Sequence, residues 1–226
     1  MRILSIDVGI KNLALCIIEI TENKEYKIID WIVINLCGEK QICCQVTKNG
    51  PCKNIAKFKN GGKNTCKRCL NKKGVILDNC TQIKNINAKD LSLIDIGVAI
   101  KNNLEKYDKI NNDILFSKIL IENQISPIAN RMKTIQGMIA QFFIMKNYTS
   151  DQIEFISASN KLKLFMESKK TTYSERKILS ISITSKLLDS LSEWKAYFLK
   201  SKKKDDLADC FLQGLWYLKK NNFIPN

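Results

Sequence analysis

The chain opens with MRILSIDVGIKNLALCIIEI (1–20), in which an apolar run leads directly to one acid, Asp7. A second β-rich run at 13–20 and a third at 26–35 follow after short polar links, which is typical of an antiparallel meander. A strand this apolar is expected to be buried, and an unpaired carboxylate at its end would be costly. Asp7 therefore needs a chemical partner.

The rest of the core pattern alternates strands with helices. LFSKILIEN (115–123) is expected to be a strand ending in Glu122, and QIEFIS (152–157) another strand. A helix over about 90–107 is expected, with Leu91, Ile94 and Val98 on one face. Further helices are expected after Pro127 and over about 159–167, 174–191 and 205–220. This order predicts an α/β fold with a mixed central sheet flanked by helices.

The segment 37–88 interrupts this pattern, because Lys, Asn, Gly and Cys replace Ile and Leu. We expect a core of 1–36 with 89–226 and an inserted subdomain of 37–88. No signal peptide and no apolar stretch of about 20 residues is found, so no membrane contact is expected. The nine cysteines are then expected as thiols or metal ligands in a reducing, intracellular compartment. The lack of histidine excludes imidazole bases and His-ligated metals.

Acids recur where the core elements begin or end. Asp7 and Glu122 end two strands, and KKKDDLADC (202–210) opens the last helix. In that helix Asp206 and Asp209 are i,i+3 neighbours and share one face. The apolar residues beside that face would pack the helix on the sheet: Leu207, Cys210, Phe211, Gly214, Leu215 and Leu218. The helix could therefore bring its acids to the ends of both strands.

Carboxylates gathered in this way repel one another unless cations neutralise them. All-oxygen ligation suits Mg²⁺ or Mn²⁺, and two such ions about 3.5–4 Å apart support phosphodiester hydrolysis. Each acid alone also has an ordinary explanation, since Asp7 could cap a turn, Glu122 could end a strand in solvent, and acids favour helix N-termini. Taken together, the acids favour a metal site.

Three motifs, SIDVGIKNLA (5–14), ILIENQ (119–124) and KKKDDLADCFL (202–212), resemble the RNase H-like nucleases. Within that superfamily they are most similar to the RuvC-like Holliday-junction resolvases of the poxvirus and large-DNA-virus branch. The resemblance covers roughly 1–36 and 89–220. IDVG also begins sugar kinases and actin-like ATPases, but no further glycine-rich phosphate loop follows, and no small-molecule cofactor is expected.

The resemblance implies a crossover junction endodeoxyribonuclease that acts in DNA recombination and repair. Its four carboxylates would be Asp7, Glu122, Asp206 and Asp209, holding two Mg²⁺ ions, with Asp205 as a second candidate for the third position. The resemblance further implies a homodimer that cuts a four-way junction symmetrically. A viral origin, and hence a cytoplasmic or viral replication site, rests on this resemblance alone.

The inserted segment departs from the compact members of that family. Four cysteines in it, Cys44, Cys52, Cys66 and Cys69, could bind a tetrahedral structural Zn²⁺. Either Cys43 or Cys44 would serve, and Cys44 is chosen because its spacing to Cys52 is tighter. A glycine-rich unit of this size with few apolar residues would need such a metal to fold. Reduced cysteines without a ligand are the alternative.

The chain is strongly basic, with 37 Lys and Arg against 22 Asp and Glu and a net charge of +15. From Lys40 to Leu77 there are ten basic residues and no acidic one, so the insertion is expected to contact nucleic-acid phosphates. The candidate nucleic-acid-binding residues are Lys11, Lys57, Lys59, Lys67, Arg68, Arg131, Lys133, Lys203 and Lys204. Lys161 and Lys163 are weaker candidates, and a solvated side chain is the alternative for every one of them.

Three other functions fit the same features. An RNase H-type enzyme would use the same fold on RNA–DNA hybrids. A transposon-type nuclease commonly carries its zinc ligands between the second and third acids, whereas here they fall between the first and second. A non-catalytic, zinc-dependent nucleic-acid-binding protein would tolerate loss of the acids and not of the cysteines.

Overall fold

The computed structural model describes residues 1–38, 40–72, 80–83, 87–107, 115–124, 130–165 and 172–225. The chain divides into two compact units: unit 1 is Met1–Leu36 with Ser92–Asn226, and unit 2 is Cys37–Leu91. Unit 2 thus ends three residues after the insertion boundary expected at 88. Pro127, which was expected to precede a helix, lies outside the described residues.

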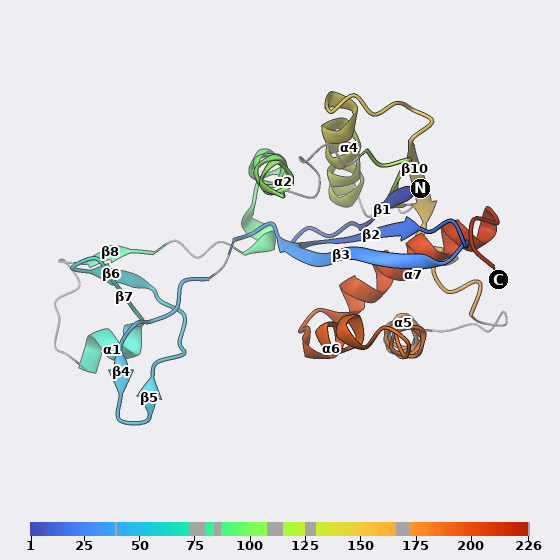
Figure 1. Ribbon diagram of the computed structural model, residues 1–226. Helices are drawn as coiled ribbons and strands as arrows, with labels where there is room; N and C mark the ends of the chain where they lie inside the picture. The colour runs from blue at the N-terminus through green and yellow to red at the C-terminus, as the bar shows by residue number, and fades with distance from the viewer. Residues whose placement is uncertain are drawn as a thin grey trace. The chain divides into compact units, whose positions relative to one another are not determined.

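Unit 1 is built on a five-stranded sheet with the order β10-β9-β1-β2-β3 (Figure 1). Its strands are β1 (Arg2–Asp7), β2 (Asn12–Ile20), β3 (Tyr26–Asn35), β9 (Lys118–Asn123) and β10 (Ile153–Ser157). The first three pair antiparallel, whereas β9 runs parallel to both β1 and β10. The predicted α/β fold with a mixed sheet and an antiparallel meander is confirmed.

The strand register brings two of the acids to one edge of the sheet. Ile6 of β1 pairs with Ile121 of β9, so Asp7 and Glu122 occupy the next position on each strand. Parallel neighbours end at the same edge, and their side chains alternate in phase. The ends of β1 and β9 therefore present Asp7 and Glu122 side by side.

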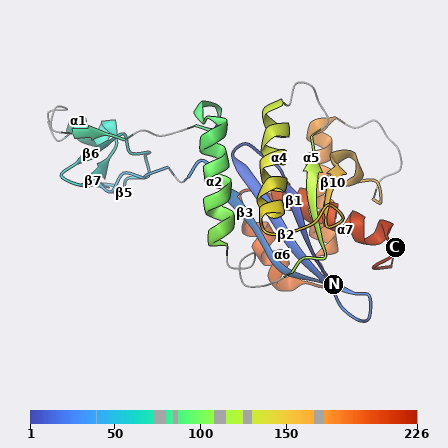
Figure 2. The ribbon, with the colours of Figure 1, turned by 90° about the horizontal axis from the view of Figure 1, so that it is seen from above.

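Helices cover both faces of this sheet (Figures 1 and 2). On one face α7 (Lys204–Lys220) packs against β1, β2 and β3, with α5 (Tyr173–Leu187) and α6 (Ser192–Lys200) beside it. On the other face α4 (Asn130–Met145) packs on β9, and α2 (Leu93–Lys106) packs on α4. Two layers of helices thus enclose the strands that carry the acids.

The packing of α7 on the sheet places the last two acids. The apolar face expected for this helix is fully buried, which confirms that prediction. A Cβ on Gly214 would lie 2.7 Å from Cδ1 of Ile18 and 3.3 Å from Cβ of Ser5, so the helix approaches the strands more closely than another residue would allow. The first turns of α7 consequently lie at the edge where β1 and β9 end.

The helix expected over about 90–107 is present as α2, although its apolar face does not pack on the core. Ile94 and Val98 of α2 are 78% and 52% exposed, and the helix packs instead through Ile96, Ile100 and Leu104. Both faces of this helix are apolar, so periodicity alone could not assign the buried one.

The helix expected over about 159–167 is a short 3₁₀ helix, Ala158–Asn160, followed by turns through Phe165, with the remaining residues outside the described part. No helix in the described ranges is long and apolar enough to cross a bilayer.

Unit 2 is a small cysteine-centred fold. Its elements are β4 (Val46–Thr47), β5 (Gly50–Pro51), β6 (Phe58–Asn60), β7 (Lys63–Thr65), α1 (Lys67–Lys72), β8 (Cys80–Gln82) and a 3₁₀ turn, Ala88–Asp90. β4 pairs with β5, and β6 lies between β7 and β8. Gly61 and Gly62 both have positive φ in the two-residue turn between β6 and β7, a conformation that glycine adopts without strain.

Candidate active site and metal centre

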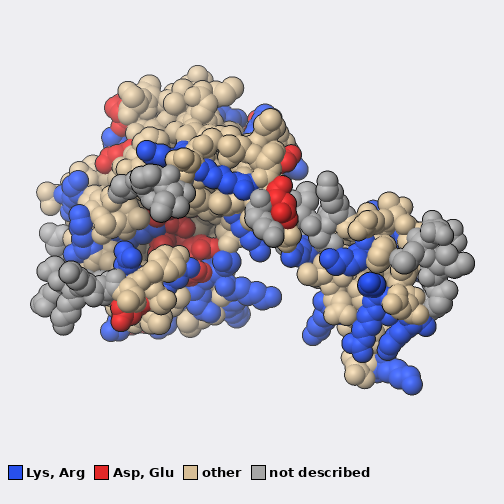
Figure 3. Space-filling view, turned by 180° about the vertical axis from the view of Figure 1, so that it is seen from behind, with Lys and Arg blue, Asp and Glu red and all other residues tan. Residues whose placement is uncertain are grey.

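The predicted acids of unit 1 meet in one pocket of about 420 Å³. Figure 3 shows Asp and Glu side chains gathered in a hollow of this unit, with Lys and Arg around it. The pocket is lined by all five candidate acids, Asp7, Glu122, Asp205, Asp206 and Asp209. Strand ends and the first turns of α7 thus converge, as the sequence pattern indicated.

Lys161 lies at the centre of the acids. Its Nζ donates to Oδ1 of Asp7 at 2.6 Å and to Oε1 of Glu122 at 2.9 Å. A third contact joins it to Oδ2 of Asp209 at 3.2 Å. Lys161 is 4% exposed and follows the 3₁₀ turn after β10, so the sheet and its next connection position it. Sequence reasoning ranked this residue among the weaker DNA contacts and missed this position.

Burial and mutual repulsion shift the pKa values in this cluster. Burial raises the pKa of Asp7 to about 7; Lys161 opposes the rise and Glu122 adds to it. Burial likewise raises the pKa of Asp209. For Lys161, burial favours the neutral amine, but the three carboxylates outweigh it and raise its pKa. One ammonium therefore faces more acid than it can neutralise, and the pocket favours further cations.

Asp206 and Asp205 differ in their surroundings. Oδ2 of Asp206 accepts from Nδ2 of Asn12 at 2.9 Å and lies 3.3 Å from Nζ of Lys203. Oδ2 of Asp205 instead accepts from Nζ of Lys177 on α5 at 2.8 Å. Asn12 begins β2, next to the end of β1, so Asp206 is the one of the two acids that is tied to the sheet edge.

A chain of amides holds Glu122. Nε2 of Gln124 donates to Oε2 of Glu122 at 2.7 Å, and the Gln124 backbone N–H donates to Oε1 of Gln136 at 2.8 Å. Gln136 is a buried residue of α4. Glu122 thus has one oxygen fixed by an amide and the other by Lys161, which sets its orientation at the pocket.

The donor set suits a hard divalent cation. Every candidate ligand is a carboxylate oxygen, the preferred partner of Mg²⁺ and Mn²⁺. The carboxylate oxygens of Asp7, Glu122 and Asp209 surround Nζ of Lys161. Binding of divalent ions would favour the ionised form of Asp7, whose pKa is raised by burial and, to a smaller extent, by Glu122.

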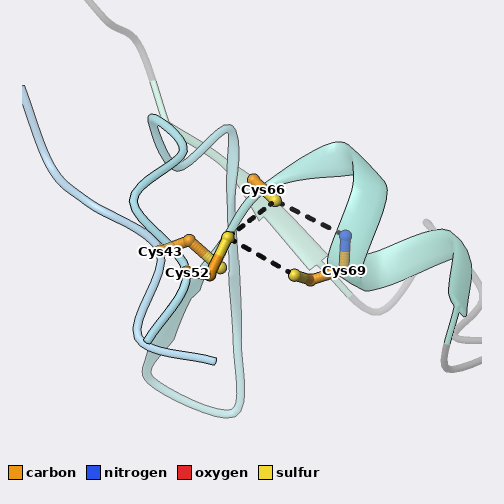
Figure 4. Close-up of side chains that lie close together, drawn as sticks. All are labelled: Cys43, Cys52, Cys66 and Cys69. Carbon is orange, nitrogen blue, oxygen red and sulfur yellow. Dashed lines mark hydrogen bonds between the residues drawn. The ribbon is translucent and has the colours of Figure 1, made fainter. Parts of the chain in front are cut away.

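In unit 2 the thiols of Cys43, Cys52, Cys66 and Cys69 form a cluster (Figure 4). Their sulfur atoms all lie within 4.8 Å of one another, and all four residues are buried. Among the described residues, these four cysteines are the group of potential metal ligands whose ligand atoms lie this close together. The cluster is a four-thiol site that could hold a tetrahedral metal ion.

The choice of Cys44 was wrong. Cys44 is exposed, and its thiol donates to the carbonyl of Asn64 at 3.1 Å, whereas the neighbouring Cys43 points into the cluster. Adjacent residues in extended chain project to opposite sides, so only one of the two can face the other cysteines. The antiparallel β-bridge between Ile42 and Ile55 fixes the direction of the adjacent Cys43 side chain. The number of residues between each cysteine and Cys52 does not reveal this pairing.

Hydrogen bonds favour the thiolate form of Cys66. Burial acts to raise the pKa of Cys66, but the backbone N–H of Cys69 and the side chain of Asn54 donate to its sulfur and lower the pKa to about 7. The sulfur of Cys52 lies 3.8 Å from that of Cys66 and 3.6 Å from that of Cys69. A thiolate already favoured at one position is what a metal ion requires.

A groove of about 770 Å³ lies next to this cluster in unit 2. Its lining includes the basic residues Lys48, Lys53, Arg68 and Lys72. Of the predicted DNA-binding residues in unit 2, Arg68 lines the groove. The other three, Lys57, Lys59 and Lys67, are exposed but do not line it.

The predicted DNA-binding residues of unit 1 differ in their position relative to the acid pocket: some line it or lie at the start of α7, and others do not line it. Lys11 lines the acid pocket, and Lys203 and Lys204 lie at the start of α7. Arg131 and Lys133 begin α4 but do not line that pocket, although the neighbouring Met132 does.

Comparison with known proteins identifies the fold. No family model matches the chain. The uncharacterised protein L451 of Acanthamoeba polyphaga mimivirus is 26% identical over a 309-residue alignment that covers 96% of this chain and 74% of that protein. The fowlpox virus Holliday junction resolvase aligns with a TM-score of 0.52 at 18% identity, covering 98% of this chain and 99% of that one. The chain has the resolvase fold.

Two further structures agree. The fowlpox virus resolvase in complex with Holliday junction DNA gives a TM-score of 0.51 at 18% identity, again covering 98% and 99% of the two chains. The yeast mitochondrial Holliday junction resolvase Ydc2 gives 0.50 at 19% identity, covering 98% of this chain and 84% of that one. The RNase H-like fold implied by the three motifs is thereby confirmed. At such identities the similarity concerns the fold.

Proposed function

We propose that this protein is a structure-selective DNA endonuclease that resolves four-way junctions by hydrolysis of phosphodiester bonds. The observation that carries the proposal is the convergence of Asp7, Glu122, Asp206 and Asp209 on one pocket of a resolvase fold. A cluster of carboxylates in which burial raises the pKa of Asp7 and of Asp209, surrounded by basic side chains, fits cation-assisted chemistry on a polyanion.

These four carboxylates would hold two Mg²⁺ or Mn²⁺ ions. When bound, the ions would activate water and stabilise the leaving oxygen. The protein's own residues prepare the site: Gln124 and Asn12 orient Glu122 and Asp206 through hydrogen bonds. Lys161 keeps Asp7 and Asp209 close together before cations bind.

In unit 2, Cys43, Cys52, Cys66 and Cys69 would hold one structural Zn²⁺. The four buried sulfurs form much of the interior of this unit, which has few other buried apolar groups. Units this small commonly need a metal to fold. The zinc would thus shape the groove that lies beside Cys52 and Cys69.

That groove would bind DNA phosphates. Between residues 40 and 72 there are nine basic residues and no acidic one, and four of the basic residues line the groove. Contacts to phosphates give affinity and position without reading base sequence, as recognition of junction shape requires. A lowered salt dependence of DNA binding after removal of Lys48, Lys53, Arg68 and Lys72 would support this role.

A homodimer would supply two active sites for the two cuts. Its interface would be the apolar groove between α2 and α4, with a volume of about 950 Å³. Large apolar side chains are exposed there: Ile94 (78%), Val98 (52%), Ile144 (50%) and Met145 (77%). An exposed apolar face of this kind marks an interface, and a two-fold substrate is best matched by a second copy of the chain.

The test is cleavage of a labelled four-way DNA junction in Mg²⁺, beside a linear duplex and an RNA–DNA hybrid. Cleavage of the junction alone, lost in Asp7→Asn while binding persists, would support the proposal. Cleavage of the hybrid instead would favour an RNase H-type enzyme. Binding without cleavage in Mg²⁺ and in Mn²⁺ would favour a non-catalytic nucleic-acid-binding protein.

A further inference from the structure

An aromatic ring stands exposed at the rim of the acid pocket. Tyr173, the first residue of α5, lines the pocket and is 67% exposed, more than any other aromatic residue among those described. Two other aromatic residues, Phe155 on β10 and Tyr197 on α6, are 46% and 41% exposed, and neither lines this pocket. An exposed ring buries little apolar surface, so core packing does not account for Tyr173.

The ring of Tyr173 is linked to the acids through Lys177. Nζ of Lys177 lies 5.1 Å from the ring centroid and donates to Oδ2 of Asp205 at 2.8 Å. Asp205 immediately precedes Asp206, a candidate metal ligand. The cation–π contact and the ion pair therefore position the ring with respect to the catalytic acids while leaving most of its surface open.

The start of α5 is fixed as well. Oγ1 of Thr172 accepts from the backbone N–H of Glu175 at 3.3 Å, and the Glu175 carboxylate accepts from the backbone N–H of Thr172 at 2.7 Å. This reciprocal capping box sets the first turn and so the direction in which Tyr173 leaves the helix. The exposed ring thus stands on an ordered turn.

We infer that Tyr173 is a nucleobase-binding subsite, which stacks on the base adjacent to the scissile phosphate. The inference rests on the proposed nuclease function and names a further part of the same site. Aromatic side chains stack on bases of any sequence, because every base presents a π-face. In a continuous duplex that face is covered by neighbouring bases, whereas a base at a branch point can be freed at low cost. Tyr173 would thereby favour cleavage at the branch.

The test is a cycle that combines removal of the ring with removal of the base. Wild type and Tyr173→Ala are compared on a junction of normal sequence and on one with an abasic site next to the cleaved bond. We expect Tyr173→Ala to lower kcat/KM about tenfold on the normal junction and to have little effect on the abasic one. Tyr173→Phe, which retains stacking, should cut the normal junction nearly as fast as wild type.

Phe155→Ala is the matched control, since it removes an exposed aromatic ring outside the pocket, and it should leave both rates unchanged. Equal loss on both junctions would overturn the inference, because a structural role does not depend on the base. So would wild-type rates for Tyr173→Ala.

The same cycle measured on affinity in Ca²⁺ separates this inference from the nuclease proposal. If wild type binds the junction but does not cut it in Mg²⁺ or in Mn²⁺, the nuclease proposal fails. The binding cycle then still decides the subsite: loss of affinity on the normal junction alone supports it, and unchanged or equally reduced affinity overturns it.

Discussion

Nζ of Lys161 lies 2.6 Å from Oδ1 of Asp7, although 154 residues separate the two in sequence. The same amine also contacts Glu122 and Asp209, so one buried cation joins acids from two strands and a helix. The pocket is therefore held together in the absence of metal ions by a lysine.

Lys161→Met should destabilise the metal-free protein. Removing one partner of a buried ion pair leaves the others uncompensated and costs about 3–5 kcal/mol. The loss should be smaller at pH 5 than at pH 7.5, because burial raises the pKa of Asp7 to about 7 and this carboxylate is then protonated at pH 5. Thermal unfolding in EDTA measures it, with the exposed Lys163→Met as the control. Equal stability of the two variants would show that Lys161 does not hold the cluster.

Asp7→Asn should remove a pH dependence from the stability of the metal-free protein. The pKa of Asp7 is raised to about 7 in the folded state, so this group binds a proton in the folded chain that the unfolded chain releases from about pH 4 upward. Its contribution to stability is therefore present at low pH and is lost as the pH rises to about 7. Unfolding in EDTA at pH 5 and pH 7.5 measures the change. The exposed Asp189→Asn should keep the wild-type slope; a retained slope in Asp7→Asn would contradict the assignment.

Asp206→Asn and Asp205→Asn should differ in activity. Asp206 is tied to the strand edge by Asn12 and is a proposed metal ligand, so its amide variant should lose at least about a hundredfold in metal-dependent cleavage. Asp205 pairs with Lys177 at a partly exposed position, and its amide variant should lose less than about tenfold. Single-turnover cleavage rates over a Mg²⁺ titration compare the two. The reverse order would make Asp205 the ligand.

Cys43→Ser should abolish zinc binding, and Cys44→Ser should not. Of these two cysteines, Cys43 is the one whose sulfur lies with those of Cys52, Cys66 and Cys69. Its loss leaves three thiolates and an open position in the metal site. Elemental analysis of the purified variants should give one zinc per chain for wild type and Cys44→Ser. Full zinc content in Cys43→Ser would exclude it as a ligand.

Charge placed on the α2–α4 groove should separate the dimer. Ile94→Glu and Val98→Glu put a carboxylate on the exposed apolar face, where burial in an interface would be costly. Sedimentation equilibrium should give a monomer for these variants and a dimer for wild type. Leu199→Glu, on an exposed position of α6 outside the groove, should remain dimeric. A dimer in all variants, or a monomeric wild type, would contradict the proposed interface.

The sequence was most informative where one local pattern decides the geometry. Asp7 and Glu122 each end an apolar run, and the D-x-x-D spacing of Asp206 and Asp209 places both on one helical face, so their convergence was predictable. The position of Lys161 among the acids was not predictable, because this residue follows β10 in a turn. In a turn, no helical or strand periodicity specifies which way a side chain points. A lone lysine in a chain with 37 basic residues carries no local signal of burial.

Two other features show the same limit. The choice between Cys43 and Cys44 depends on a bridge between Ile42 and Ile55, which are 13 residues apart, and linear spacing does not reveal that pairing. Ile94 and Val98 form a regular apolar face, yet tertiary packing buries the opposite face of α2. Both features depend on contacts between distant segments.

The most direct test of the central proposal is the position of the cuts in a single four-way junction whose opposing strands carry different labels. With Mg²⁺ present, we expect nicks at symmetric positions in two opposing strands, and none with Asp7→Asn. Absence of cutting by the wild-type protein, or equal cutting by Asp7→Asn, would contradict the assignment of this acid pocket as the catalytic centre of a junction-resolving nuclease.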